Sequence, residues 1–175
     1  MGAWAGPFLI AAVLLAGAGV AKAVDPVATV GALRGFGVRV PPAVVRAGGG
    51  LEVAIAVVAA TTGNPVAALA VAASYLLFTA FVVAARVRRL PIGSCGCFGK
   101  IDTPPSAVHV VVNLGAAAAA IGVAVHDGGG LRDVLAAQPL GAVPFVLLVA
   151  VGAYAAFTAL TVVPRLATLR ADRHP

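Results

Sequence analysis

The segment PVAALAVAASYLLFTAFVVAARV, Pro65 to Val87, is apolar almost throughout and has Arg86 as its single charged residue. A helix needs about 20 such residues to cross the roughly 30 Å hydrocarbon layer of a bilayer. The 175-residue chain shares this character, because 61% of its residues are hydrophobic, 10% are charged and its mean hydropathy is +1.05. In soluble domains about a quarter of the residues are charged. The composition therefore predicts an integral membrane protein.

Four further apolar runs of similar length accompany this one, and each is expected to form a transmembrane helix. The five expected spans are 7–24, 42–62, 65–87, 105–125 and 141–163. We expect the first run to be a retained helix, because its first lysine, Lys22, follows the apolar stretch instead of preceding it as in a signal peptide. The predicted fold class is all-α, an integral membrane helical bundle. It is expected to form a single domain over residues 1–175, with a basic tail at 164–175.

Lysines and arginines gather in alternate connections between the apolar runs. Segments 22–46, 86–102 and 164–175 are basic, whereas 61–65 is uncharged and 126–138 is slightly acidic. Short loops rich in lysine and arginine stay in the cytoplasm. We therefore expect a multi-pass protein of the cell membrane, with its N-terminus outside and its C-terminus cytoplasmic.

The net charge of +6 does not predict a nucleic-acid partner. The basic residues form short clusters beside the apolar runs, without the interleaved aromatic residues of a nucleic-acid surface. The partner that the composition predicts is the lipid bilayer.

Both cysteines of the chain lie in one glycine-rich loop, SCGCFG, residues 94–99. Gly96 allows the backbone between Cys95 and Cys97 to bend into the small ring that a disulfide there requires. Strained disulfides exchange readily, and the basic residues between Arg86 and Lys100 favour the reactive thiolate. One interpretation is therefore a redox pair.

Two other interpretations of the cysteines stay open. Two thiolates can chelate a soft ion such as Cu(I) or Zn(II), but structural zinc takes four ligands and the loop has no third sulfur or histidine, so we assign no metal site. The pair can also be a tolerated feature of a tight loop, since reactivity depends on exposure.

Polar residues inside the spans are further candidates. Glu52 lies near the middle of its span, where an acid either serves a function or is protonated and hydrogen-bonds a neighbouring helix. His109 and Asn113 share one helix face after the cysteine loop; His109 is a candidate proton shuttle for the thiols, and Asn113 is a candidate interhelical hydrogen-bonding residue. Lys22 and Asp25, three residues apart, are expected to pair at the end of the first span.

The chain resembles a known family in three motifs. GVAKAVDP (19–26), LEVAIAV (51–57) and SCGCFG (94–99), the last before a span that carries Asn113, are similar to the methylamine-utilisation MauE family within the wider DoxX-like group. The resemblance extends to about Val125. It implies a four-helix DoxX-like core, to which this chain adds a fifth C-terminal transmembrane helix.

The resemblance also implies site residues and a function. The redox pair of the family falls on Cys95 and Cys97, with Gly96, Phe98 and Gly99 completing its motif. The family's lysine, aspartate and second-span acid fall on Lys22, Asp25 and Glu52. MauE supports the maturation of methylamine dehydrogenase, whose small subunit is rich in disulfides, and DoxX-like relatives are linked to quinone-coupled oxidation. A quinone is therefore the implied cofactor.

The sequence thus predicts a membrane redox protein with a thiol-disulfide oxidoreductase-like activity, whose partner is a thioredoxin-like protein or a disulfide-rich client. One alternative is a small-solute or soft-metal carrier, with Glu52 and Asn113 along its path. Another is a non-catalytic assembly factor. Two expectations conflict, because disulfides form mainly outside the cytoplasm whereas the charge bias places the cysteine loop inside.

Overall fold

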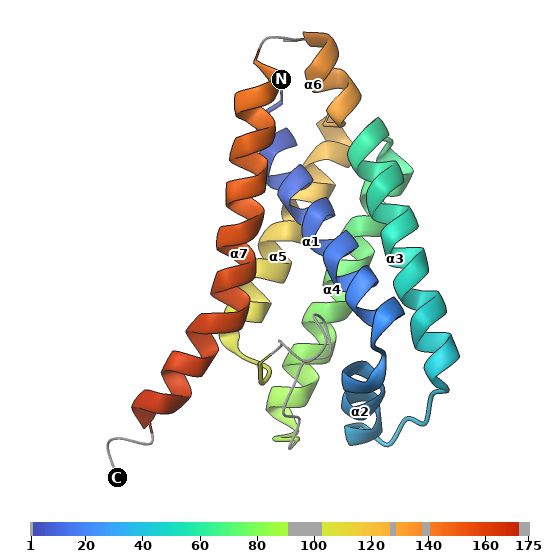
Figure 1. The fold of residues 1–175 in the computed structure, drawn as a ribbon, viewed down its shortest axis with the longest axis vertical. Coiled ribbons are helices and arrows are strands. Elements are labelled where there is room, and N and C mark those ends of the chain that lie inside the picture. Colours follow the sequence, from blue (N-terminus) through green and yellow to red (C-terminus); the bar gives the residue numbers. More distant parts are fainter. Residues whose placement is uncertain (1, 91–102, 127–128, 138–140, 172–175) are drawn as a thin grey trace.

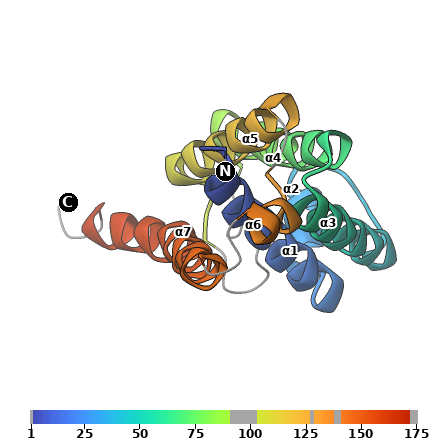
Figure 2. The ribbon, with the colours of Figure 1, turned by 90° about the horizontal axis from the view of Figure 1, so that it is seen from above.

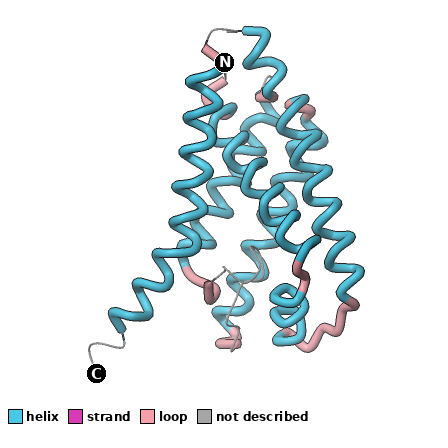
Figure 3. The backbone as a smooth tube through the Cα atoms, in the orientation of Figure 1, coloured by secondary structure: helices cyan, strands magenta, loops and turns pink. Residues whose placement is uncertain are grey.

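The structure of the protein, a computed structural model, describes residues 2–90, 103–126, 129–137 and 141–171, and only the backbone of 165–171. The described residues form helices and no strand (Figure 3). The helices are α1 (Ala5–Val24), α2 (Val27–Gly35), α3 (Pro42–Thr62), α4 (Pro65–Val87), α5 (Ala107–His126), α6 (Leu131–Ala137) and α7 (Ala142–Ala171).

Five of these helices are long and apolar enough to cross a membrane: α1, α3, α4, α5 and the Ala142–Pro164 part of α7. The predicted class, an all-α membrane bundle, is confirmed, and the protein is a multi-pass membrane protein. Helix α5 begins at Ala107 and not at Pro105 as expected. Proline disfavours helical backbone in the residue before it, so Pro104 and Pro105 keep Thr103 and Pro104 out of the helix, which begins two residues after Pro105.

The two short helices, α2 and α6, were not predicted. They lie at opposite ends of the bundle (Figure 1). Isolated helices of fewer than about 12 residues are marginal in water, so local sequence carries little signal for them. Packing explains α2, in which Ala32 is buried in a cluster with Ala85 of α4 and the Phe36 and Phe81 side chains.

The turn expected between the second and third spans is present and is capped at both ends. Gly63 closes α3 with a φ of 62°, in the left-handed region that favours glycine. The Asn64 side chain then accepts hydrogen bonds from the backbone N–H groups of Val66 and Ala67, at 2.9 and 3.2 Å. These contacts begin α4 directly after α3, so the two helices run antiparallel from this turn.

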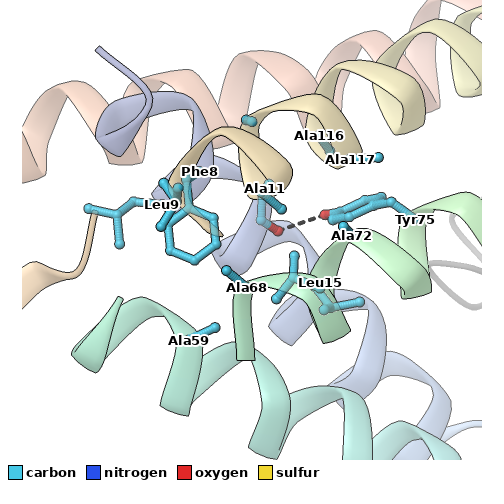
Figure 4. Packing of buried hydrophobic residues seen from close by; sticks show 14 of the residues in the cluster. Phe8, Leu9, Ala11, Leu15, Ala59, Ala68, Ala72, Tyr75, Ala116 and Ala117 are labelled. Atoms are coloured by element: carbon cyan, nitrogen blue, oxygen red, sulfur yellow. Dashed lines mark hydrogen bonds between the residues drawn. The ribbon is translucent and has the colours of Figure 1, made fainter. Parts of the chain in front are cut away.

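The spans pack mainly in two pairs, α1 with α3 and α4 with α5, while α7 lies on the outer side against α1 and α5 (Figures 1 and 2). The core between the pairs is built from alanines around a few larger side chains, including Phe8 and Leu15 (Figure 4). Tyr75 of α4 is buried there, and its hydroxyl donates a 2.6 Å hydrogen bond to the Ala11 carbonyl of α1. Tyr154 of α7, in contrast, is 72% exposed.

Glycine determines how closely α1 and α3 approach. A Cβ atom on Gly19 would lie 2.5 Å from the Gly49 carbonyl oxygen, and one on Gly49 would lie 2.5 Å from the Gly19 carbonyl oxygen. The close approach of α1 and α3 thus depends on Gly19 and Gly49. A Cβ on Gly17, Gly48 or Gly50 would meet nothing within 4 Å, so these three glycines are not required for the close approach of the two helices.

Helix α7 continues through Pro164 to Ala171, so part of the segment expected as a tail is helical. Its C-terminal end points away from the bundle (Figures 1 and 2). Proline removes one intrahelical hydrogen bond without forcing a helix inside a membrane protein to end.

Candidate functional site

A buried ion pair joins α1 to α3. The Lys22 ammonium lies 2.7 Å from both carboxylate oxygens of Glu52. The side chains are 8% and 17% exposed, so the pair is largely withdrawn from solvent. The expected pairing of Lys22 with Asp25 is therefore wrong: Lys22 is directed to Glu52, and Asp25 accepts a 3.1 Å hydrogen bond from the Val27 backbone N–H.

The glycine contact explains why these two charges meet. Lys22 follows Gly19 by three residues and Glu52 follows Gly49 by three, so each charge lies on the same helix face as its glycine. A Cβ on Gly49 would lie 3.0 Å from the Lys22 Cβ, so the missing side chain makes room for the lysine stem. A buried charge is costly unless it is paired, and Glu52 is the acid that this face presents to Lys22.

A third helix completes the surroundings of the ion pair. The Lys22 ammonium lies 4.3 Å from the centre of the Phe78 ring of α4. This distance is within the range of a cation–π contact. Phe78 was not singled out in the sequence, because an aromatic residue in an apolar run gives no signal of a charged neighbour.

The ion pair lies in the wall of a cavity of about 420 Å³. Helices α3 and α4 diverge from their common turn, and α2 lies at the open end between them (Figure 1). Apart from Lys22, Thr29 and Glu52, the lining is glycine and apolar side chains from α2, α3, α4 and the α2–α3 connection. Two lining residues, Val44 and Leu77, are 57% and 69% exposed, so the cavity reaches the outer surface of two membrane-spanning helices.

This cavity is where a quinone could be held, but its polar groups are already engaged. Both Glu52 oxygens accept from Lys22, the Lys22 ammonium faces Phe78, and Thr29 has an interaction of its own. A quinone site needs a hydrogen-bond donor aimed at a carbonyl oxygen. Lys22, Glu52 and Thr29, the polar residues that line this cavity, do not set one aside, and the quinone stays a prediction.

The motif Cys95, Gly96, Cys97, Phe98 and Gly99 lies outside the described residues. Among the residues that are described, no group of three or more histidine, cysteine or acidic side chains could hold a metal ion.

The flanks of the cysteine segment are described and are both anchored to the bundle. On one flank, Leu90 packs against the Ala32 and Ala85 cluster, whose Phe81 also lines the cavity. On the other, the buried Thr103 hydroxyl donates a 2.9 Å hydrogen bond to the Leu160 carbonyl of α7. Both described flanks, Leu90 and Thr103, are therefore held by packing or hydrogen bonding to the bundle.

A guanidinium joins the two flanks. Arg86, at the end of α4, donates a 3.3 Å hydrogen bond to the carbonyl of Pro105, just before α5. Its positive charge is thus held at the base of the segment that carries both cysteines.

His109 and Asn113 lie side by side on α5, as expected, and both are buried, with 2% and 6% exposed. The Nδ1 atom of His109 is 2.8 Å from the Ser106 hydroxyl. Both residues line a small cavity that also borders Tyr75 and Phe78. Phe78 lines this cavity and the larger one, so it separates His109 from the ion pair.

Comparison with known proteins gives one result. The family model described as "Methylamine utilisation protein MauE" matches residues 1–126. No curated protein and no solved structure matches the chain. The matched region contains α1 to α5, the ion pair and the cysteine motif, whereas α6 and α7 lie beyond it.

Proposed function

This chain belongs to the MauE family of membrane proteins, and from that membership we propose that it carries out thiol-disulfide exchange through Cys95 and Cys97. The family description places its members in methylamine utilisation. We propose that the exchange partner is a disulfide-rich client or a thioredoxin-like protein, and that the protein acts in the cell membrane.

The observation that carries the proposal is the Arg86 contact with the Pro105 carbonyl. It keeps a cation between the two flanks of the cysteine segment. A nearby positive charge favours thiolate over thiol, and the thiolate is the nucleophile in disulfide exchange. Arg88 and Arg89 follow directly in sequence and add to the same local charge.

The proposed exchange transfers two electrons and can run in either direction. One thiolate of the pair attacks a disulfide of the partner, forms a mixed disulfide and releases one partner thiolate. The second cysteine attacks the mixed disulfide, releases the other partner thiolate and leaves the pair oxidised. The partner gains two electrons and the pair loses two; the reverse sequence oxidises a client.

The buried residues have supporting roles in this proposal. The Lys22–Glu52 pair holds α1 against α3 and lines the same cavity as Phe81. Phe81 in turn packs in the cluster that contains Leu90, the described residue just before the cysteine segment. His109, hydrogen-bonded to Ser106 at the start of α5, would relay protons for the thiols.

The test is a redox titration of the cysteines in membranes. Free thiols are trapped with an alkylating reagent across a series of poised potentials, once with a permeable and once with an impermeable reagent. Cys95→Ser and Cys97→Ser are compared with Ser94→Ala, which alters the same motif and keeps both thiols. We expect a reversible two-electron transition that each cysteine variant abolishes and Ser94→Ala preserves.

Other outcomes identify the alternatives. Thiols that stay free at every potential would refute the redox function. Bound copper or zinc that is lost in Cys95→Ser would favour a metal carrier, and full function of a double cysteine variant would favour an assembly factor. The impermeable reagent decides which side of the membrane the pair faces.

A further inference from the structure

Two arginines lie beside the large cavity, and none of the acidic residues that the structure describes pairs with them. Arg34 lies in the last turn of α2 and Arg39 in the connection to α3, and both line a second hollow of about 340 Å³ with Val40, Pro41 and Pro42. Among the residues that the structure describes, neither guanidinium is in an ion pair. Both side chains are exposed.

The arginine hollow and the apolar cavity are adjacent. Val40 lines both, and Leu33, the neighbour of Arg34, also lines the cavity. Two positive charges therefore stand beside a cavity whose lining, apart from Lys22, Thr29 and Glu52, is glycine and apolar side chains. Within that space, Lys22 and Glu52 neutralise each other, so the excess charge comes from the arginines.

The start of α3 at Pro42 indicates how deep in the membrane the two arginines lie. Pro42 begins a helix that crosses the membrane, so Arg39 to Pro41 lie where the span meets the aqueous boundary. That is the level of lipid headgroups. The cavity beyond Val40 extends to Val44 and Leu77, which are exposed on the outer faces of α3 and α4, toward the acyl chains.

From this arrangement we infer that the protein binds an anionic phospholipid, with its phosphate on Arg34 and Arg39 and an acyl chain in the cavity beside Lys22 and Glu52. Guanidinium groups bind phosphate through paired hydrogen bonds, and basic pockets between transmembrane helices select anionic headgroups. The apolar lining favours a lipid over a free anion. The inference does not depend on the thiol chemistry.

The test uses the full-length protein, purified in mild detergent and stripped of lipid, then titrated with phosphatidylglycerol, phosphatidylcholine or inorganic phosphate. Native mass spectrometry counts the bound lipid. The double variant R34Q/R39Q removes both headgroup contacts. Its control, R89Q/R132Q, removes two charges that line neither hollow.

A second variant tests the acyl-chain site. Gly48 lines the cavity, and a Cβ there would meet nothing within 4 Å, so Gly48→Leu starts a side chain in open space beside the cavity. Gly50→Leu is the matched control, because Gly50 lies in equally open space on the same helix but does not line the cavity.

We expect phosphatidylglycerol to bind about tenfold or more tightly than phosphatidylcholine, since each arginine near the headgroup favours the anionic lipid. R34Q/R39Q should remove this preference, and Gly48→Leu should weaken the binding of both lipids; both controls should bind like the native chain. Equal affinity for the two lipids, or an unchanged preference in R34Q/R39Q, would overturn the inference. Displacement of the lipid by inorganic phosphate, with no effect of Gly48→Leu, would show a free-anion site instead. The arginine side chains are exposed, so R34Q/R39Q remains a decisive variant even if Gly48→Leu fails to fold.

Discussion

The ion pair between α1 and α3 allows a quantitative prediction for Lys22→Met. The substitution keeps an apolar stem of similar length and removes the charge that Glu52 contacts at 2.7 Å through both oxygens. Because the two side chains are only 8% and 17% exposed, water cannot readily replace the ammonium. Removing one partner of a buried pair costs about 3–5 kcal/mol. We expect a loss of this size in the free energy of unfolding.

The double variant Lys22→Met/Glu52→Leu separates the pair from the packing. Replacing both members of a buried ion pair with apolar residues is often neutral or stabilising by about 1–4 kcal/mol. The double variant should therefore be more stable than Lys22→Met alone, with a coupling energy of about 2 kcal/mol or more. Arg46→Met is the control for loss of a cation from an exposed position on α3 and should change stability by less than about 0.5 kcal/mol.

The assay is equilibrium unfolding in mixed micelles with increasing denaturing detergent, followed by far-UV circular dichroism. The reasoning is refuted if Lys22→Met lies within about 1 kcal/mol of the native chain, since a buried and paired carboxylate cannot lose its partner at so low a cost. The single variant Glu52→Leu completes the comparison, and the reasoning is also refuted if the effects of Lys22→Met and Glu52→Leu simply add in the double variant, because residues in direct contact should couple.

Two further substitutions test the packing of α1. Gly49→Ala would bring a Cβ to 2.5 Å from the Gly19 carbonyl oxygen and should lower the free energy of unfolding by about 1–3 kcal/mol in the same assay. The control Gly50→Ala lies in open space and should be neutral or slightly stabilising. Equal effects of the two substitutions would contradict the close helix contact. Tyr75→Phe removes the buried hydrogen bond to the Ala11 carbonyl and should lower the free energy of unfolding by about 1 kcal/mol, with the helix content unchanged. If no loss is measured, this hydrogen bond does not stabilise the bundle.

The transmembrane helices could be predicted from the sequence because their signals are local. Pro42 and Pro65 start α3 and α4 at the expected residues, and Gly63 with Asn64 forms the turn between them. Length and apolar composition require no knowledge of the partner helix. The family could be predicted for the same reason, since short motifs within residues 1–126 carry it.

The errors came from interactions that are distant in sequence. Lys22 was expected to pair with Asp25, three residues away, but its partner Glu52 is 30 residues away on another helix. Helix α2 has too few residues to be stable alone, and its Ala32 is buried only because α4 passes beside it. Local spacing cannot show which faces of two helices meet.

The sequence alone is enough to identify a membrane bundle of five long apolar helices and to place both cysteines in one short motif, because hydrophobic length and motif spacing are properties of contiguous residues. The packed helices are needed to show that Gly19 and Gly49 bring α1 and α3 together, that Lys22 is neutralised by Glu52, and that a cavity lies between α3 and α4 with Arg34 and Arg39 beside it. The physical reason is that the cost of a buried charge and the shape of a cavity depend on which helix faces pack together, and that arrangement is set by contacts over the whole bundle.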